Sequence, residues 1–287
     1  MDTTQVHATP RLEALIQEAL QLAHEWGSSV IAERLAAALT AMQGSYEAIE
    51  LDLLATEVRR QGRLIALSRS ERALLATLAL HKRPVTREEL VELLYAHVST
   101  GIAVSQLKVY VHRVRRRLGD ALAIVCTGDG YMLGPSVAVD LRQCELEVAL
   151  AMRTRGGLPA SQYARLVRTR LRLLRRDVAW LRTFAAGADL ERRLDTLLFD
   201  VTLRIAEAAL AQSDITLTTL LSHSLSELDP SDERTAELAI RLNLARGDEA
   251  GARRAFHRYS QLLEREFAAK PSPSLCRLIT SVAGQAL

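Results

Sequence analysis

Six basic side chains within ten residues are the feature of this sequence that most clearly suggests chemistry. The six are Lys108, His112, Arg113, Arg115, Arg116 and Arg117. Apolar residues recur among them at helical spacing, at Leu107, Val111, Val114 and Leu118. At about 100° per residue, the opposite side of a helix over 104–118 carries Ser105, Val109, His112, Arg113 and Arg116, flanked by Lys108, Arg115 and Arg117. Such a helix fits a DNA major groove, although a basic helix that is merely solvated gives the same pattern.

Short elements surround this helix. Residues 47–67 alternate in short runs that predict two or three antiparallel strands. Two capping boxes follow, one from Ser68 to Glu71 and one from Thr86 to Glu89, and each precedes an apolar run. Residues 95–103 are predicted to be a loop.

A hairpin is predicted after the basic helix. Residues 123–127 and 131–133 form two short apolar runs, and Gly128-Asp129-Gly130 separates them. Strands, three helices and a terminal hairpin, in this order, predict a winged helix-turn-helix.

Residues 47–135 resemble the winged-helix DNA-binding domain of the OmpR/PhoB class. The matching pieces are Leu67-Ser68-Arg69-Ser70-Glu71 with Leu74-Leu75, Val85-Thr86-Arg87-Glu88-Glu89-Leu90, the basic helix from Val109 to Gly119, and Gly128-Asp129-Gly130-Tyr131. The resemblance implies that the basic helix enters the major groove of double-stranded DNA. It also implies that the loop from Tyr95 to Ala103 contacts RNA polymerase.

The resemblance assigns roles to individual residues of the basic helix and the wing. Arg113 occupies the position that reads a base, and an arginine fork suits the guanine edge. His112, Arg115 and Arg116 are expected to hold phosphates. Val109 meets a thymine methyl or packs on a neighbouring loop. The expected DNA-binding set is Ser105, Lys108, Val109, His112, Arg113, Arg115, Arg116 and Thr127, in which Lys108 replaces an acid and Thr127 replaces a wing arginine of the family.

The C-terminal half is predicted to be helical. Val167, Leu171, Leu174 and Val178 mark an apolar side of residues 163–178. Two helices joined at Ala245-Arg246-Gly247-Asp248 predict one tetratricopeptide-like hairpin, whereas a repeat of about 34 residues is not evident elsewhere.

This half is similar to the bacterial transcriptional activator domain of SARP-type activators. The matching residues are Asp140, Cys144 and Glu145, then residues 225–233, 245–248, 259–263 and 266–275. The predicted domains are therefore a helical hairpin over 1–43, a winged helix over 44–137 and a helical activator domain over 138–287. The hairpin matches neither family, and we expect it to mediate self-association or to pack on the helical domain.

Composition and charge limit the classes of function that the sequence can have. The 287 residues carry a formal net charge of +3, but residues 58–119 hold thirteen Lys or Arg against four Glu, as expected of a phosphate-binding module. Three scattered cysteines and the absence of a signal-peptide pattern or an apolar run long enough for a membrane span suit the cytoplasm. No catalytic, metal-binding or cofactor-binding motif is present, so we expect neither an enzyme nor a cofactor.

The sequence therefore predicts a mainly α protein with a small antiparallel β component, in which a winged helix precedes a helical repeat-like domain. The predicted function is that of a DNA-binding transcriptional regulator, an activator that recruits RNA polymerase and that can form homodimers. Two alternatives remain open. One is an adaptor that does not bind DNA, built on a degenerate winged helix, and the other is a helical-repeat scaffold that binds only protein.

Overall fold

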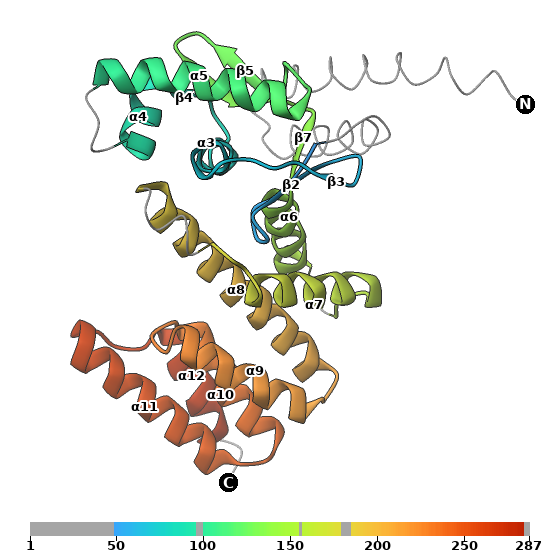
Figure 1. Ribbon diagram of the computed structural model, residues 1–287. Helices are drawn as coiled ribbons and strands as arrows, with labels where there is room; N and C mark the ends of the chain where they lie inside the picture. The colour runs from blue at the N-terminus through green and yellow to red at the C-terminus, as the bar shows by residue number, and fades with distance from the viewer. Residues whose placement is uncertain (1–48, 96–99, 155–156, 179–184, 284–287) are drawn as a thin grey trace, which may run out of the picture. The chain divides into compact units, whose positions relative to one another are not determined.

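A computed structural model describes residues 49–95, 100–154, 157–178 and 185–283. The chain divides into two compact units (Figure 1). The first unit contains residues 1–141 and 177–189, and the second contains residues 142–176 and 190–287. The hairpin predicted for residues 1–43 lies outside the described residues.

The first unit begins with a four-stranded sheet in the order β3-β2-β1-β7. The predicted antiparallel strands are confirmed as β1 (Ile49–Asp52), β2 (Glu57–Arg60) and β3 (Arg63–Leu64). The fourth strand, β7 (Val137–Val139), pairs in parallel with β1 and was not predicted. This pairing returns the chain to the start of the unit after the winged helix.

The winged helix follows the predicted order. Its elements are α3 (Arg69–Leu80), β4 (Val85–Thr86), α4 (Arg87–Tyr95), α5 (Thr100–Leu118), β5 (Ile124–Thr127) and β6 (Gly130–Leu133). The hairpin pairs with β4 in a second sheet, in the order β4-β6-β5. One boundary of the prediction was wrong, because the loop predicted to reach Ala103 ends where α5 begins at Thr100. Gly101 costs a helix only about 1 kcal/mol, which the long buried side of α5 offsets.

Both predicted capping boxes are confirmed. At α3, the Ser68 side chain accepts from the Glu71 amide, and Glu71 accepts from the Ser68 amide at 2.8 Å. At α4, the Glu89 amide donates to Thr86 Oγ1 at 3.2 Å, and the Thr86 amide donates to Glu89 Oε2 at 2.9 Å. Hydrogen bonding from Arg83, followed by that from the Thr86 amide, lowers the pKa of Glu89 to about 2. These reciprocal bonds fix the residue at which each helix starts.

The carboxylate of Asp140 holds the start of α6 (Asp140–Arg153) on the first sheet. Its Oδ1 accepts from the amide of Leu53 at 2.8 Å and from that of Leu141 at 2.7 Å. Asp177 joins the same region, because its amide donates to the Leu54 carbonyl at 2.8 Å. The first unit therefore recruits a short segment from far along the chain.

The buried side of α7 (Ala160–Leu174) differs from the prediction. The helix buries Leu166, Thr169 and Leu173, whereas the predicted apolar residues Leu171 and Leu174 are 47% and 52% exposed. The segment carries apolar residues at several helical phases, so periodicity alone does not select the side that packs. Hydrogen bonds select it here, since Thr169 Oγ1 donates to Glu147 at 2.8 Å.

The rest of the second unit is a stack of helical hairpins. Its helices are α8 (Ala185–Ala211), which enters the second unit at Leu190, α9 (Ile215–Leu228), α10 (Glu233–Ala245), α11 (Glu249–Phe267) and α12 (Pro273–Ala283). The predicted α10–α11 hairpin is confirmed, and α8–α9 forms a second one. Asp214 and Asp248, 34 positions apart, cap α9 and α11 in the same way. Ser213 takes the left-handed backbone conformation that Gly247 takes in the other hairpin. Because glycine is the usual residue in this conformation, a serine there gives no sequence signal of a turn, and the repeat was not predicted.

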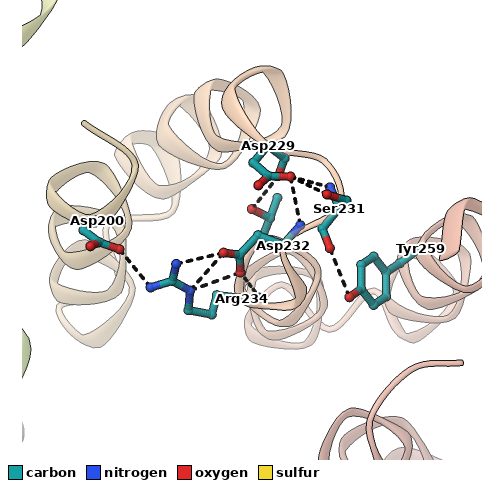
Figure 2. A network of polar contacts seen from close by, with 7 residues as sticks. Asp200, Asp229, Ser231, Asp232, Arg234 and Tyr259 are labelled. Carbon is teal, nitrogen blue, oxygen red and sulfur yellow. Dashed lines mark hydrogen bonds and ion pairs between the residues drawn. The ribbon is translucent and has the colours of Figure 1, made fainter. Parts of the chain in front are cut away.

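Polar contacts connect the two hairpins (Figure 2). Arg234, at the start of α10, donates to Asp200 of α8 at 2.9 Å and to its own N-cap residue Asp232 at 2.8 Å. The hydroxyl of Tyr259 on α11 donates to the Ser231 carbonyl at 3.3 Å. Burial is the main reason that the pKa of Tyr259 rises to about 12, so this hydroxyl stays protonated at neutral pH.

A substitution in the buried side of α5 tests the helical phase on which the site depends. Val111 is 3% exposed, so Val111→Asp places a carboxylate in the core without a partner, and we expect the winged helix to unfold. Val109→Asp is the matched control, because Val109 is 48% exposed on the same helix. Thermal unfolding followed by circular dichroism compares the two. Equal melting temperatures for both variants would contradict the assigned phase.

Candidate nucleic-acid interface

Helix α5 presents a cationic side to solvent. The opposite side of the helix packs on the core through four apolar residues that are at most 3% exposed: Leu107, Val111, Val114 and Leu118. The exposed side carries Ser105, Lys108, Val109, His112, Arg113 and Arg116. Among the described residues, no ion pair forms with Lys108, His112, Arg113 or Arg116. These four side chains are available to an anionic partner.

Two other arginines of the same run bind groups of the protein itself. Arg115 donates through Nε at 2.9 Å and through Nη2 at 2.6 Å to the Ile124 carbonyl, at the first residue of β5. Arg117 donates to the Ala66 carbonyl at 2.6 Å and pairs with Glu71 at 3.3 Å. The phosphate contact predicted for Arg115 stays a prediction, but its guanidinium already joins α5 to the wing.

The carboxylate of Glu71 connects α3 to α5. It completes the capping box of α3 and forms an ion pair with Arg117 of α5, and the residue is only 1% exposed. Arg60 supports the same end of α5 by donating to the Leu118 carbonyl at 2.8 Å. These contacts set the rotation of α5 about its own axis, and thus the direction in which its free cations point.

Arg113 rests on an aromatic platform. Its guanidinium carbon lies 5.9 Å from the centroid of the Tyr110 ring, which stacks on Tyr95 at a centroid distance of 6.2 Å. Burial raises the pKa of Tyr95 well above its usual range, so its hydroxyl stays neutral. A guanidinium over an aromatic face is attracted by the ring and loses less freedom on binding. Helical periodicity predicted the exposed position of Arg113 but not this platform.

The wing gains a cation from another element. Thr127 is half-buried, and its hydroxyl oxygen is buried without a hydrogen-bond partner among the described residues. Arg87, the first residue of α4, lies beside the wing: its Nη2 is 3.9 Å from Cys126 Sγ and its guanidinium is 5.9 Å from the Tyr131 ring centroid. Its amide also donates to the Asp129 carbonyl at 3.2 Å. Sequence reasoning missed Arg87, although its place directly after the Thr86 N-cap was visible.

Metal ligands, thiols and apolar helices of the described part of the chain bear on other kinds of site. It holds no group of three or more His, Cys, Asp or Glu side chains placed to bind a metal ion. Cys126, Cys144 and Cys276 are free thiols. None of the helices in this part is both long enough and apolar enough to cross a membrane.

The comparison with protein families agrees with this geometry. Residues 62–133 match the family described as "Transcriptional regulatory protein, C terminal". These residues are a winged-helix domain of that family. The match covers α3, α4, α5 and the wing, which are the elements that position the cations described above. The part of the chain that carries these cations thus resembles the C-terminal domain of transcriptional regulatory proteins.

A solved structure extends the likeness to both units. EmbR of Mycobacterium tuberculosis, in complex with a low-affinity phosphopeptide, is similar with a TM-score of 0.66 at 20% sequence identity. The likeness covers 83% of this chain and 66% of that chain, so this chain spans just under two thirds of its length. No protein of curated function matches the sequence. The likeness to EmbR shows that a winged helix followed by stacked helices is a known fold.

The aromatic platform under Arg113 gives a prediction about specificity. Tyr110→Leu removes the ring, and we expect affinity for the preferred DNA site to fall about twofold to fivefold, the value of an exposed cation–π contact. Affinity for random DNA should stay the same, because the charge of Arg113 remains. Fluorescence anisotropy with both duplexes measures this. Tyr110→Phe keeps the ring and serves as the control, and equal losses for Leu and Phe would contradict the platform role.

Proposed function

We propose that this chain binds double-stranded DNA with α5 in the major groove and activates transcription by recruiting RNA polymerase. The observation that carries the proposal is the set of four cations on the exposed side of a helix whose other side is buried. In this arrangement Arg113 reads a guanine edge, and Lys108, His112 and Arg116 contact phosphates. Ser105 and Val109 lie on the same exposed side, within reach of base edges.

The wing contacts the DNA beside the groove that α5 enters. Thr127 brings no charge to this contact, and Arg87 supplies the cation in its place. Arg115 takes part through the wing, because it holds the Ile124 carbonyl and so fixes the hairpin relative to α5. In this proposal Arg115 keeps both hydrogen bonds to the Ile124 carbonyl, and any contact of its guanidinium with phosphate is made in addition to them.

Two substitutions separate base reading from phosphate contact. The preferred site is first selected by the full chain from a random duplex library. Arg113→Ala should weaken binding to that site by about 1–3 kcal/mol and relax its sequence preference. Arg116→Ala should weaken binding to all sequences and lower the slope of log K against log salt by about one.

The outcomes of this experiment decide between the functions considered. Equal losses on selected and random DNA for Arg113→Ala would contradict its role in base reading. No enrichment of any site, together with no binding of random duplex at low salt, would favour the adaptor or the helical scaffold. Both variants remove an exposed side chain, so melting temperatures close to that of the parent are expected and confirm that the fold is retained.

Activation is the second part of the proposal. The resemblance assigns the residues from Tyr95 to Ala103 to the contact with RNA polymerase, and those from Thr100 onward belong to α5. We expect the full chain to increase transcript yield in vitro from a promoter that carries the selected site upstream. Unchanged yield on a promoter with a scrambled site is the control. Reduced yield from the selected site would show a repressor instead.

A further inference from the structure

Helix α7 carries a second cationic surface, which the proposed DNA contact does not use. Four exposed arginines recur at i, i+3, i+7 and i+10, and two exposed leucines lie along the edge of this row. The six residues, which we call the Arg–Leu face, are Arg165, Arg168, Leu171, Arg172, Leu174 and Arg175. All of them belong to the second unit.

Three of the four arginines of this face have no acidic partner among the described residues. Residues 160–176 contain no acidic residue. Arg165, Arg168 and Arg175 form no ion pair with the residues that the structure describes. Like charges one turn apart destabilise a helix. The arrangement therefore costs stability unless a partner with carboxylates covers it.

The packing of the other side of α7 keeps the Arg–Leu face at the surface. Leu166 and Leu173 are fully buried on the other side of α7. Two polar contacts pin that side: Thr169 Oγ1 donates to Glu147 at 2.8 Å, and Arg170 Nε donates to Thr202 Oγ1 at 3.0 Å. Rotating α7 to bury Leu171 and Leu174 would break both contacts. The leucines thus stay at the surface of the unit as described.

The leucines favour a protein partner over DNA. A row of arginines alone would suit phosphates, but a DNA backbone offers no apolar surface to Leu171 and Leu174. An amphipathic helix with an apolar stripe flanked by carboxylates offers both. Arginine is also one of the residue types enriched at protein interfaces.

The chain itself contains a sequence of this kind. Residues 10–42 carry four glutamates against two arginines. Leu12, Leu15, Ile16, Ala19 and Leu22 recur at helical spacing, and Glu18 and Glu25 flank that stripe at i and i+7. An isolated helix of this length is marginal in water, so the segment needs an apolar surface to cover.

We propose that residues 10–42 of a second copy of this chain bind the Arg–Leu face. Exchange of the segment in both directions makes an isologous dimer, the commonest form of soluble oligomer. Two equivalent contacts then bury twice the area of one helix pair. The proposal is independent of DNA binding, because it uses none of the residues of α5.

Charge reversal in the full chain tests the proposal. Arg168→Glu with Arg175→Glu should raise the dimer dissociation constant about tenfold or more, measured by sedimentation equilibrium, because like charges then face each other. Arg253→Glu with Arg258→Glu is the matched control: both arginines are exposed on α11 and form no ion pair with described residues. The control should leave the dissociation constant unchanged. Circular dichroism melts show that each variant is folded.

A second pair of reversals identifies the occupant. Glu18→Lys with Glu25→Lys should weaken the dimer as well, and combining it with the two α7 reversals should restore most of the affinity. A parent chain that is monomeric at every concentration would overturn the proposal, as would α7 reversals that leave the dimer intact or a combination that restores nothing. If the α7 reversals instead lower the salt slope of DNA binding in a monomer, the face contacts DNA and the proposal is wrong.

Discussion

The geometry of α5 depends on the contacts of one buried carboxylate, that of Glu71. A charged group that is 1% exposed must be paired, and this one has two kinds of partner. The Ser68 amide completes the start of α3, and Arg117 reaches it from the last turn of α5. Because both partners come from helix ends, one carboxylate sets where α3 begins and how α5 is rotated. Removing one partner would leave a buried charge uncompensated, which typically costs 3–5 kcal/mol.

The arginines of the basic run of α5 fall into two groups. Arg115 and Arg117 donate inward to carbonyls and to Glu71 within the domain, whereas Arg113 and Arg116 form no ion pair with the described residues. A planar guanidinium suits both settings, because it reaches several acceptors at once and keeps its charge under all conditions. The inward pair holds the wing and the core to α5. Net charge alone overstates the number of cations that are free to meet phosphate.

Local patterns predicted much of this fold and of the candidate site. Both capping boxes, the wing hairpin and the buried side of α5 rest on residues at most a few positions apart, and all are present. The parallel pairing of β7 with β1 joins three-residue stretches far apart in the chain, and no local signal marks it. The α8–α9 hairpin was missed because Ser213 stands where a glycine would have marked the turn. The inward role of Arg115 depends on a carbonyl from another element, which no helical periodicity reveals.

The two cationic helices differ in what surrounds their arginines, and this difference bears on their partners. Among the α5 side chains that the structure describes, Val109 is the one large apolar residue that is about half exposed. This matches a groove in which a thymine methyl is the main apolar feature. On α7, two exposed leucines form a row beside the arginines. Apolar side chains that are exposed side by side often mark a surface that another protein covers. Similar net charge on two helices of one chain is thus compatible with DNA for the first and with a protein for the second.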